Sequence, residues 1–125
     1  MKIVIKTIAH SRQRYPTVGD WYTQKGVLYI TVSKMTDWRY ELLVAVHELV
    51  EVSLCKHRGI KQSEVDAFDI AFEKNRLPGN TDEPGSDRDA PYQREHWFAT
   101  NLESLLAAEL DVNWFKYEKA VNSLP

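Results

Sequence analysis

The chain lacks the features that mark secreted and membrane-spanning proteins. Cys55 is its only cysteine, so no disulfide can form within the chain, and nothing indicates an oxidising compartment. The longest uncharged apolar run, from Leu42 to Val46, is far too short to cross a bilayer. The first residues alternate in polarity, which is unlike the pattern of a signal peptide. We therefore expect a cytoplasmic protein that has no membrane partner.

The chain also lacks an excess of charge of one sign. Its 16 Lys and Arg residues nearly balance 18 Asp and Glu residues, and the net charge is −2. This balance predicts no general affinity for nucleic acid or for membrane surfaces. Hydrophobic residues make up 43% and charged residues 27%, which excludes long disorder and low-complexity classes. A length of 125 residues predicts one domain, spanning 1–125, with a single hydrophobic core.

The first third of the chain predicts β structure. Ile3 and Ile5 alternate with their neighbours as in a short strand. The β-prone runs Trp21–Tyr22 and Val27–Val32 flank a short segment that contains Gly26, which is typical of a hairpin. We expect a small antiparallel sheet of about three strands that packs on the helices by one face.

The rest of the chain predicts three or four helices, and the expected fold class is therefore α+β. Strong helix formers without Gly or Pro fill the segment from Tyr40 to His57, and Gly59 follows as a stop signal. The other expected helices span 63–75, 91–110 with Pro91 in the first turn, and a short C-terminal segment capped by Asp111 or Asn113. Residues 78–91 are rich in Pro, Gly and Asp and predict an acidic loop.

The first expected helix carries ionisable side chains in its most apolar stripe. At about 100° per residue, His47 and Glu51 share the face of Leu43, Val44 and other apolar residues. An unpaired carboxylate in such surroundings typically costs several kcal/mol. Residues four apart project side by side, about 6 Å apart along the helix axis, so both side chains can bind one ion. A bound metal ion would therefore satisfy both groups at once.

The string His47-Glu48-Leu49-Val50-Glu51 resembles the His-Glu-x-x-His helix of the zincin metallopeptidases. By position, the resemblance implies that His47 is a metal ligand and that Glu48 is the general base. Glu51 stands where that family has its second His, and a carboxylate can also bind zinc. The resemblance implies a divalent metal, with zinc as the first candidate. It also implies a metal-dependent hydrolase that acts on a peptide or protein substrate.

The third ligand is expected from the third helix. His96 borders an apolar face that includes Phe98, Leu102 and Leu105, and it completes the predicted metal set of His47, Glu51 and His96. A set of two His and one carboxylate leaves coordination positions open for water and substrate. Three carboxylates remain alternatives to His96, or partners that orient a bound imidazole: Glu95, Glu103 and Asp69.

A purely structural interpretation of the same helix is also open. His47 and Glu51 then form a hydrogen bond with each other in the core. Alternatively, Glu48 and Glu51 face Arg12 or Arg14 from the loop at residues 10–16, and in neither arrangement is a metal involved.

The whole chain resembles a small uncharacterised family found in phages and prophages. The resemblance rests on Arg14-Tyr15, Thr17-Val18-Gly19-Asp20-Trp21, His47-Glu48-Leu49-Val50-Glu51, Phe68-Asp69, Glu83-Pro84-Gly85, Ala90-Pro91-Tyr92 and Glu95-His96. It implies a phage or prophage origin but no particular activity. A second possible function is therefore a non-enzymatic phage accessory domain that binds a protein, with interface anchors among Trp21, Trp38, Trp97 and Trp114.

A third possible function is that of a nucleoside-triphosphate pyrophosphatase. Glu48-x-x-Glu51 and Asp66-x-x-Asp69 resemble the carboxylate pairs of the MazG-like nucleoside-triphosphate pyrophosphatases, which implies magnesium as the cofactor. That family is all-α, and the β-rich N-terminus of this chain has no place in its fold.

Overall fold

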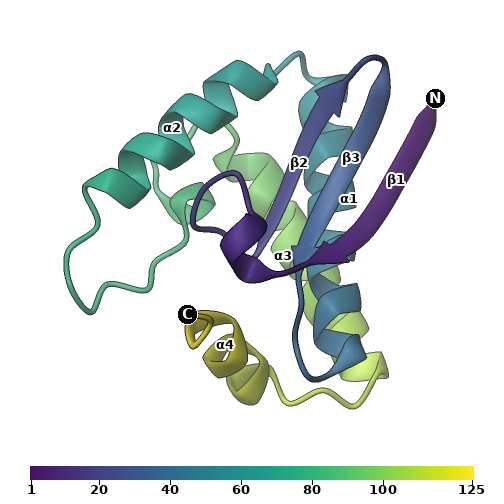
Figure 1. Cartoon of the computed structure of the whole chain (residues 1–125), viewed down its shortest axis with the longest axis vertical. Coiled ribbons are helices and arrows are strands. Elements are labelled where there is room, and N and C mark those ends of the chain that lie inside the picture. The colour runs from purple at the N-terminus through teal and green to yellow at the C-terminus, as the bar shows by residue number, and fades with distance from the viewer.

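Three strands and four α-helices follow one another in the computed structural model, which describes all residues from Met1 to Pro125 (Figure 1). Their bounds are β1 Lys2–Ile8, β2 Gly19–Gln24, β3 Val27–Ser33, α1 Trp38–His57, α2 Gln62–Lys74, α3 Gln93–Glu109 and α4 Trp114–Asn122. Two 3-10 turns, η1 His10–Arg12 and η2 Pro84–Ser86, lie in the connections. The fold class is α+β, as predicted, with the sheet at the N-terminus.

The sheet is mixed, so the expectation of an antiparallel sheet was wrong for one strand. The strand order is β1-β3-β2, and β3 is antiparallel to β2 but parallel to β1. The connection through η1 carries the chain past the place of β3, and the β2–β3 hairpin then inserts β3 between the other two strands. Ile30 and Val32 of β3 are fully buried, whereas Ile3 and Ile5 of β1 remain about half exposed. The most apolar strand therefore takes the central position.

The expected hairpin is confirmed. β2 and β3 join through the two-residue turn Lys25–Gly26, and both residues have positive φ, 51° and 76°. Two left-handed residues are typical of the turn whose twist matches that of the flanking strands.

The expected helices are present, with shifts of one or two residues at their starts. α1 begins at Trp38 because the Asp37 side chain accepts a hydrogen bond from the Arg39 backbone N–H. α2 begins at Gln62, one residue before the expected start. α3 begins at Gln93, and Pro91 lies in the preceding turn rather than in the helix. Asn113, rather than Asp111, caps α4 by accepting from the Lys116 N–H.

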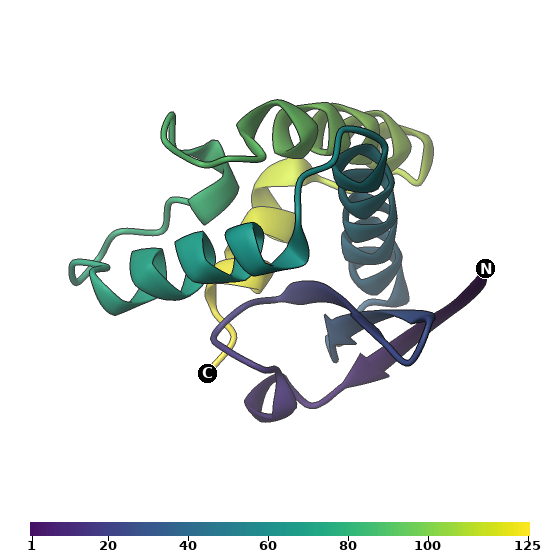
Figure 2. The ribbon, with the colours of Figure 1, turned by 90° about the horizontal axis from the view of Figure 1, so that it is seen from above.

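α1 is the central element of the molecule. It packs on β2 and β3 with one face and on α3 with another, and Figure 2 shows the sheet and α3 on opposite sides of the molecule. Arg39 near the start of α1 donates to the carbonyl of Leu110 after α3, and Arg58 after α1 pairs with Glu95 near the start of α3. The two helices therefore run antiparallel. No helix is both long and apolar enough to cross a membrane.

The inward face of α3 differs from the expected one. Phe98 and Leu105 are 50% and 66% exposed, so they do not form a buried apolar face. The side chains that α3 buries are mostly polar or small: Glu95, His96, Ala99, Glu103 and Ala107. Polar side chains of α3 are thus placed against the polar stripe of α1.

Candidate metal centre

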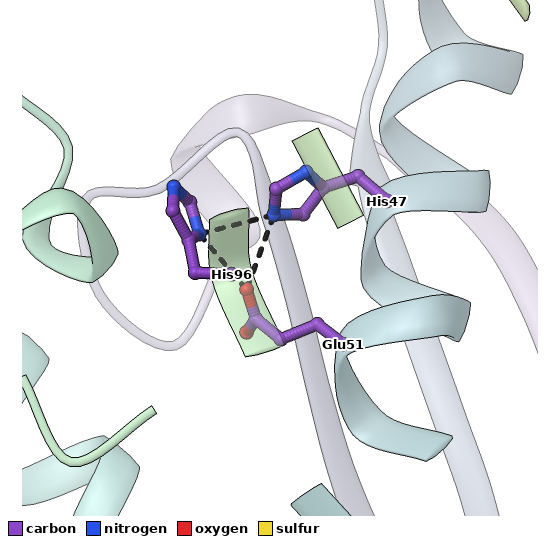
Figure 3. A group of neighbouring side chains, drawn as sticks. All are labelled: His47, Glu51 and His96. Carbon is purple, nitrogen blue, oxygen red and sulfur yellow. Dashed lines mark hydrogen bonds and ion pairs between the residues drawn. The ribbon is translucent and has the colours of Figure 1, made fainter. Parts of the chain in front are cut away.

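One nitrogen or oxygen atom from each of His47, Glu51 and His96 lies at the corner of a small triangle (Figure 3). His47 Nε2 lies 3.1 Å from His96 Nδ1 and 3.1 Å from Glu51 Oε2, and His96 Nδ1 lies 3.0 Å from Glu51 Oε2. All three side chains are buried. The expected convergence of these three residues, two from α1 and one from α3, is confirmed.

With Glu51 ionised, every arrangement of protons leaves one contact of this triangle unfavourable. If both imidazole nitrogens carry a proton, both donate to Glu51, and the contact between His47 and His96 is repulsive. If one nitrogen is bare, its contact with the carboxylate places two lone pairs against each other. A cation attracts all three atoms at once. Ligand atoms at the usual zinc distances stand about 3.4 Å apart in a tetrahedral site, close to the edges of this triangle.

Each of the three side chains also has an outer partner. His47 Nδ1 lies 2.8 Å from Glu103 Oε1, and Glu103 Oε2 accepts a 2.5 Å hydrogen bond from the Tyr117 hydroxyl in α4. A proton on Nδ1 leaves the Nε2 lone pair of His47 free to face an ion. Such carboxylate–imidazole pairs orient metal ligands in known sites. Glu103 is thus placed as the orienting partner, which was one of its two expected roles.

Glu51 and His96 are held from other segments. Trp21 Nε1 in β2 donates to Glu51 Oε1 at 3.1 Å. His96 Nε2 lies 2.6 Å from Glu83 Oε2, an ion-pair contact whose angles are not those of a hydrogen bond. Gly85 in η2 covers the His96 ring so closely that a Cβ there would lie 2.4 Å from His96 Cγ. These contacts fix the orientation of both side chains.

The electrostatics of the triangle favour two protonated imidazoles around one carboxylate when no metal is bound. Burial lowers the pKa of His47, but hydrogen bonds with Glu103 and Glu51 outweigh burial and raise that pKa well above its ordinary value. For His96, the hydrogen bond with Glu51 and the ion-pair contact with Glu83 outweigh burial and raise its pKa to about 9. Burial raises the pKa of Glu51, but its bonds to the two imidazoles lower it to about 2. A metal ion must therefore displace protons.

Glu48 lies beside the triangle with its carboxylate unpaired. It is half-buried, it faces the same cavity as His47, and no side chain or backbone group forms a hydrogen bond with it. A Cβ on Gly19 would lie 2.8 Å from Glu48 Oε1, so β2 passes close to this carboxylate. Burial and the neighbouring charge of Glu51 raise the pKa of Glu48 well above its ordinary value. An unpaired carboxylate with a raised pKa is suited to accept and return a proton.

The structure contradicts part of the purely structural interpretation. Arg14 binds Asp20 through two hydrogen bonds of 2.7 and 2.9 Å and also pairs with Asp66, and Arg12 is exposed. Neither arginine contacts Glu48 or Glu51, because Asp20 and Asp66 engage the Arg14 guanidinium and Arg12 faces solvent. The hydrogen bond between His47 and Glu51 is present, as that interpretation required.

Two of the alternative third ligands lie outside the triangle. Glu95 pairs with Arg58 at 2.6 Å. Asp69 was expected to accept from a bound imidazole, which was wrong: it accepts from the hydroxyl groups of Tyr15, at 2.9 Å, and Tyr92. The phenol groups of Tyr15 and Tyr92, which belong to two distant segments, donate to Asp69, and no imidazole forms a hydrogen bond with it.

Sequence reasoning missed the outer partners Trp21, Glu83 and Tyr117. Trp21 and Tyr117 are buried aromatic residues whose single polar atom turns toward the centre. No local spacing relates them to His47, since they lie on β2 and α4. Glu83 belongs to the predicted acidic loop, and only its place above His96 distinguishes it from the other acidic residues there.

A groove with a volume of about 780 Å³ opens onto the centre. Its wall includes all three triangle residues, Glu48, and side chains of α2, α3, α4 and the loop 80–86. The acidic loop, expected either to line a substrate path or merely to join two helices, lines this groove. The groove and the unpaired carboxylate of Glu48 thus both lie next to the triangle.

The carboxylate pairs expected of a MazG-like pyrophosphatase are engaged elsewhere. Arg14 holds Asp66, and two tyrosines hold Asp69. The N-terminal sheet is also foreign to that all-α fold. These contacts favour the metal set of His47, Glu51 and His96 over a magnesium site that includes Asp66 and Asp69.

Comparisons of the chain with protein-family models, with curated proteins and with solved structures found no match. The resemblance to a phage family and to the zincin helix therefore stays a prediction. Function has to be argued from the geometry of the centre and its groove.

Proposed function

We propose that the protein is a metal-dependent hydrolase of the metallopeptidase type, in which His47, Glu51 and His96 hold a divalent ion. Zinc is the first candidate for this ion. The observation that carries the proposal is the triangle of ligand atoms, 3.0 to 3.1 Å apart, in which each residue has its own outer partner. Structural ion pairs need no such triangle, whereas metal ligands do.

The chemistry follows from the position of the unpaired carboxylate. A divalent ion with an open coordination position supplies Lewis acidity, which polarises a carbonyl group and lowers the pKa of water. Glu48 accepts a proton from the attacking water as the water oxygen bonds to the substrate carbonyl carbon. As the C–N bond breaks, Glu48 returns this proton to the leaving amine. The groove of about 780 Å³ supplies space for a substrate next to Glu48 and the triangle.

The test separates the base from the ligands. Protein purified without chelator should contain about one equivalent of metal by elemental analysis and should cleave fluorogenic peptides. Glu48→Gln should keep the metal and lose about 10²-fold or more of kcat, because it removes the proton acceptor but no ligand. His47→Ala should lose both metal and activity. Glu109→Gln, an exposed substitution on α3, should change neither.

Other results of the same measurements would contradict the proposal. Circular dichroism checks that each variant is folded, so that loss of metal is not loss of structure. If the native protein contains no stoichiometric metal, and zinc, manganese or iron neither raises its melting temperature nor elicits hydrolysis, the proposal fails. The exposed Trp38 and Trp97, 64% and 57% accessible, would then favour a protein-binding domain.

A further inference from the structure

The groove concentrates negative charge that the chain as a whole does not have. Ten of the 18 Asp and Glu residues line its wall, against only one of the 16 Lys and Arg residues, Arg76. The net charge of the whole chain is only −2. Lys116 and Lys119 of α4 and Lys74 of α2 are absent from the wall, although neighbouring acidic residues of the same helices line it.

Several of the ten carboxylates have no cationic partner. Arg14 holds two of them, Arg76 holds one, and the imidazoles and phenols of the wall hold four more. The three that have no Arg, imidazole or phenol partner are Glu48, Asp82 and Glu118. Glu48 adjoins the metal triangle, whereas Asp82 and Glu118 are exposed residues of the wall that form no contact with the triangle.

Aromatic side chains accompany these carboxylates between α3 and α4. Trp97 follows His96 directly, is 57% exposed and lines the groove. Trp114 of α4 also lines the groove and donates from Nε1 to Glu118 at 3.0 Å. Indole faces next to carboxylates bind ammonium and guanidinium groups, since both attract a cation and the indole also covers the aliphatic stem.

We infer that the groove takes a polypeptide that carries lysine or arginine next to the bond to be cleaved. This inference rests on the proposed function and names its substrate class. A divalent ion at the triangle compensates the carboxylates around it, but it leaves Asp82 and Glu118 to face the substrate. Anionic substrates such as nucleotides find no free cationic side chain in the wall, because Arg76 binds Glu73 and the Asn80 carbonyl.

The experiment measures binding, so that it does not depend on turnover. Zinc-loaded Glu48→Gln protein is titrated with three labelled decapeptides that differ only in two central residues, which are Lys, Gln or Glu. We expect the Lys peptide to bind roughly tenfold more tightly than the Gln peptide, and the Glu peptide to bind least. Raising the salt concentration should reduce the preference, because exposed charges are screened.

A matched pair of variants locates the preference. Asp82→Asn combined with Glu118→Gln should remove most of the preference for the Lys peptide. Asp89→Asn combined with Glu109→Gln removes the same charge from exposed positions outside the groove and should leave the preference unchanged. Equal binding of the three peptides, or an unchanged preference in the first pair, would overturn the inference.

The outcome is separable from that of the proposed function. Metal-dependent hydrolysis by the native protein without a charge preference would leave the proposed function standing and overturn the inference. A charge preference lost in the Asp82 and Glu118 variant, without any hydrolysis, would support a groove that binds cationic polypeptides and overturn the proposed function.

Discussion

At the scale of single residues, the protonation of His47 and His96 governs whether a metal can enter the centre. Both imidazoles have raised pKa values, about 9 for His96, so both are protonated at neutral pH in the metal-free protein. Zinc binding at pH 7 should therefore release about two protons, and the affinity should fall roughly hundredfold for each pH unit below 7. Isothermal titration calorimetry in buffers with different ionisation enthalpies measures the protons released.

An affinity that stays constant between pH 6 and 8 would contradict this expectation, since it would mean that both imidazoles are neutral before the ion binds. Glu103→Gln provides a comparison. It keeps the shape of the Glu103 side chain but removes the charge that helps to hold the proton on His47. Fewer protons should then be released, while the affinity at high pH should fall about 10- to 100-fold because the imidazole is less well oriented.

At the scale of the elements, the short turn η2 positions a ligand that lies on a different helix. Gly85 touches the His96 ring, and a Cβ would approach its Cγ to 2.4 Å and its Nδ1 to 2.5 Å. Gly85→Ala should therefore displace the ring from its present position and weaken zinc binding about tenfold or more, with a free energy of unfolding lowered by roughly 1–3 kcal/mol. Competition with a chromophoric chelator measures the affinity.

The neighbouring substitution Ser86→Ala serves as the control for η2. Ser86 is exposed, and only its backbone carbonyl accepts a hydrogen bond, from Gln93. This variant should bind zinc like the native protein. Equal affinities of the Gly85→Ala and Ser86→Ala variants would show that η2 does not position the ligand.

Helix α2 is held by polar contacts as well as by Val65 and Phe68, and the contacts of Asp69 predict a pH dependence of stability. Burial raises the pKa of Asp69 to about 7, although hydrogen bonds from Tyr92 and Tyr15 oppose the change. The unfolded chain has an ordinary carboxyl pKa, so between about pH 4 and 7 the folded state binds the proton more tightly. This contribution to stability is present at low pH and is lost as the pH rises through 7.

Asp69→Asn should remove that part of the pH dependence. From pH 5 to 8, the free energy of unfolding should fall by roughly 2 kcal/mol less in the variant than in the native protein. Urea titrations in the presence of EDTA measure it, and the imidazoles of the centre contribute equally to both proteins. Asp89→Asn, at an exposed site, should follow the native curve. Parallel curves for Asp69→Asn and the native protein would show that Asp69 is ionised throughout.

At the scale of the whole molecule, the centre joins segments that are far apart in the sequence. Its ligands come from α1 and α3, and their outer partners come from β2, the loop before η2, α3 and α4. Metal binding should therefore stabilise the whole fold. Free zinc at about 100 times the dissociation constant adds about 2.7 kcal/mol, which corresponds to a rise in melting temperature of roughly 10 °C.

Calorimetry with zinc and with EDTA measures this difference. His96→Ala should abolish it, because the ion then loses its only ligand from α3. His57→Ala removes an exposed histidine at the end of α1 and should keep the full shift. A melting temperature that does not respond to zinc in the native protein would argue against a metal that joins the two helices.

The local elements were predictable to within one or two residues, because hairpins and helices follow from the spacing of apolar residues and from capping side chains. Asp37 and Asn113 cap the helices that follow them, and Lys25–Gly26 forms the turn. The direction of β1 was not predictable. Alternation along a strand says which face is buried, but it contains nothing about the direction of the neighbouring strand.

The sequence by itself determined that His47 and Glu51 lie side by side with Glu48 next to them, because a helix places residues four apart on one face whatever surrounds it. It also indicated His96 as their partner. Only the tertiary structure decided that Glu103 orients His47 while Glu95 pairs with Arg58, and that Asp69 binds two tyrosines. Trp21, Glu83 and Tyr117 reach the centre for the same reason: contacts between segments depend on how the sheet, α1, α3 and α4 pack, and no local spacing records that packing.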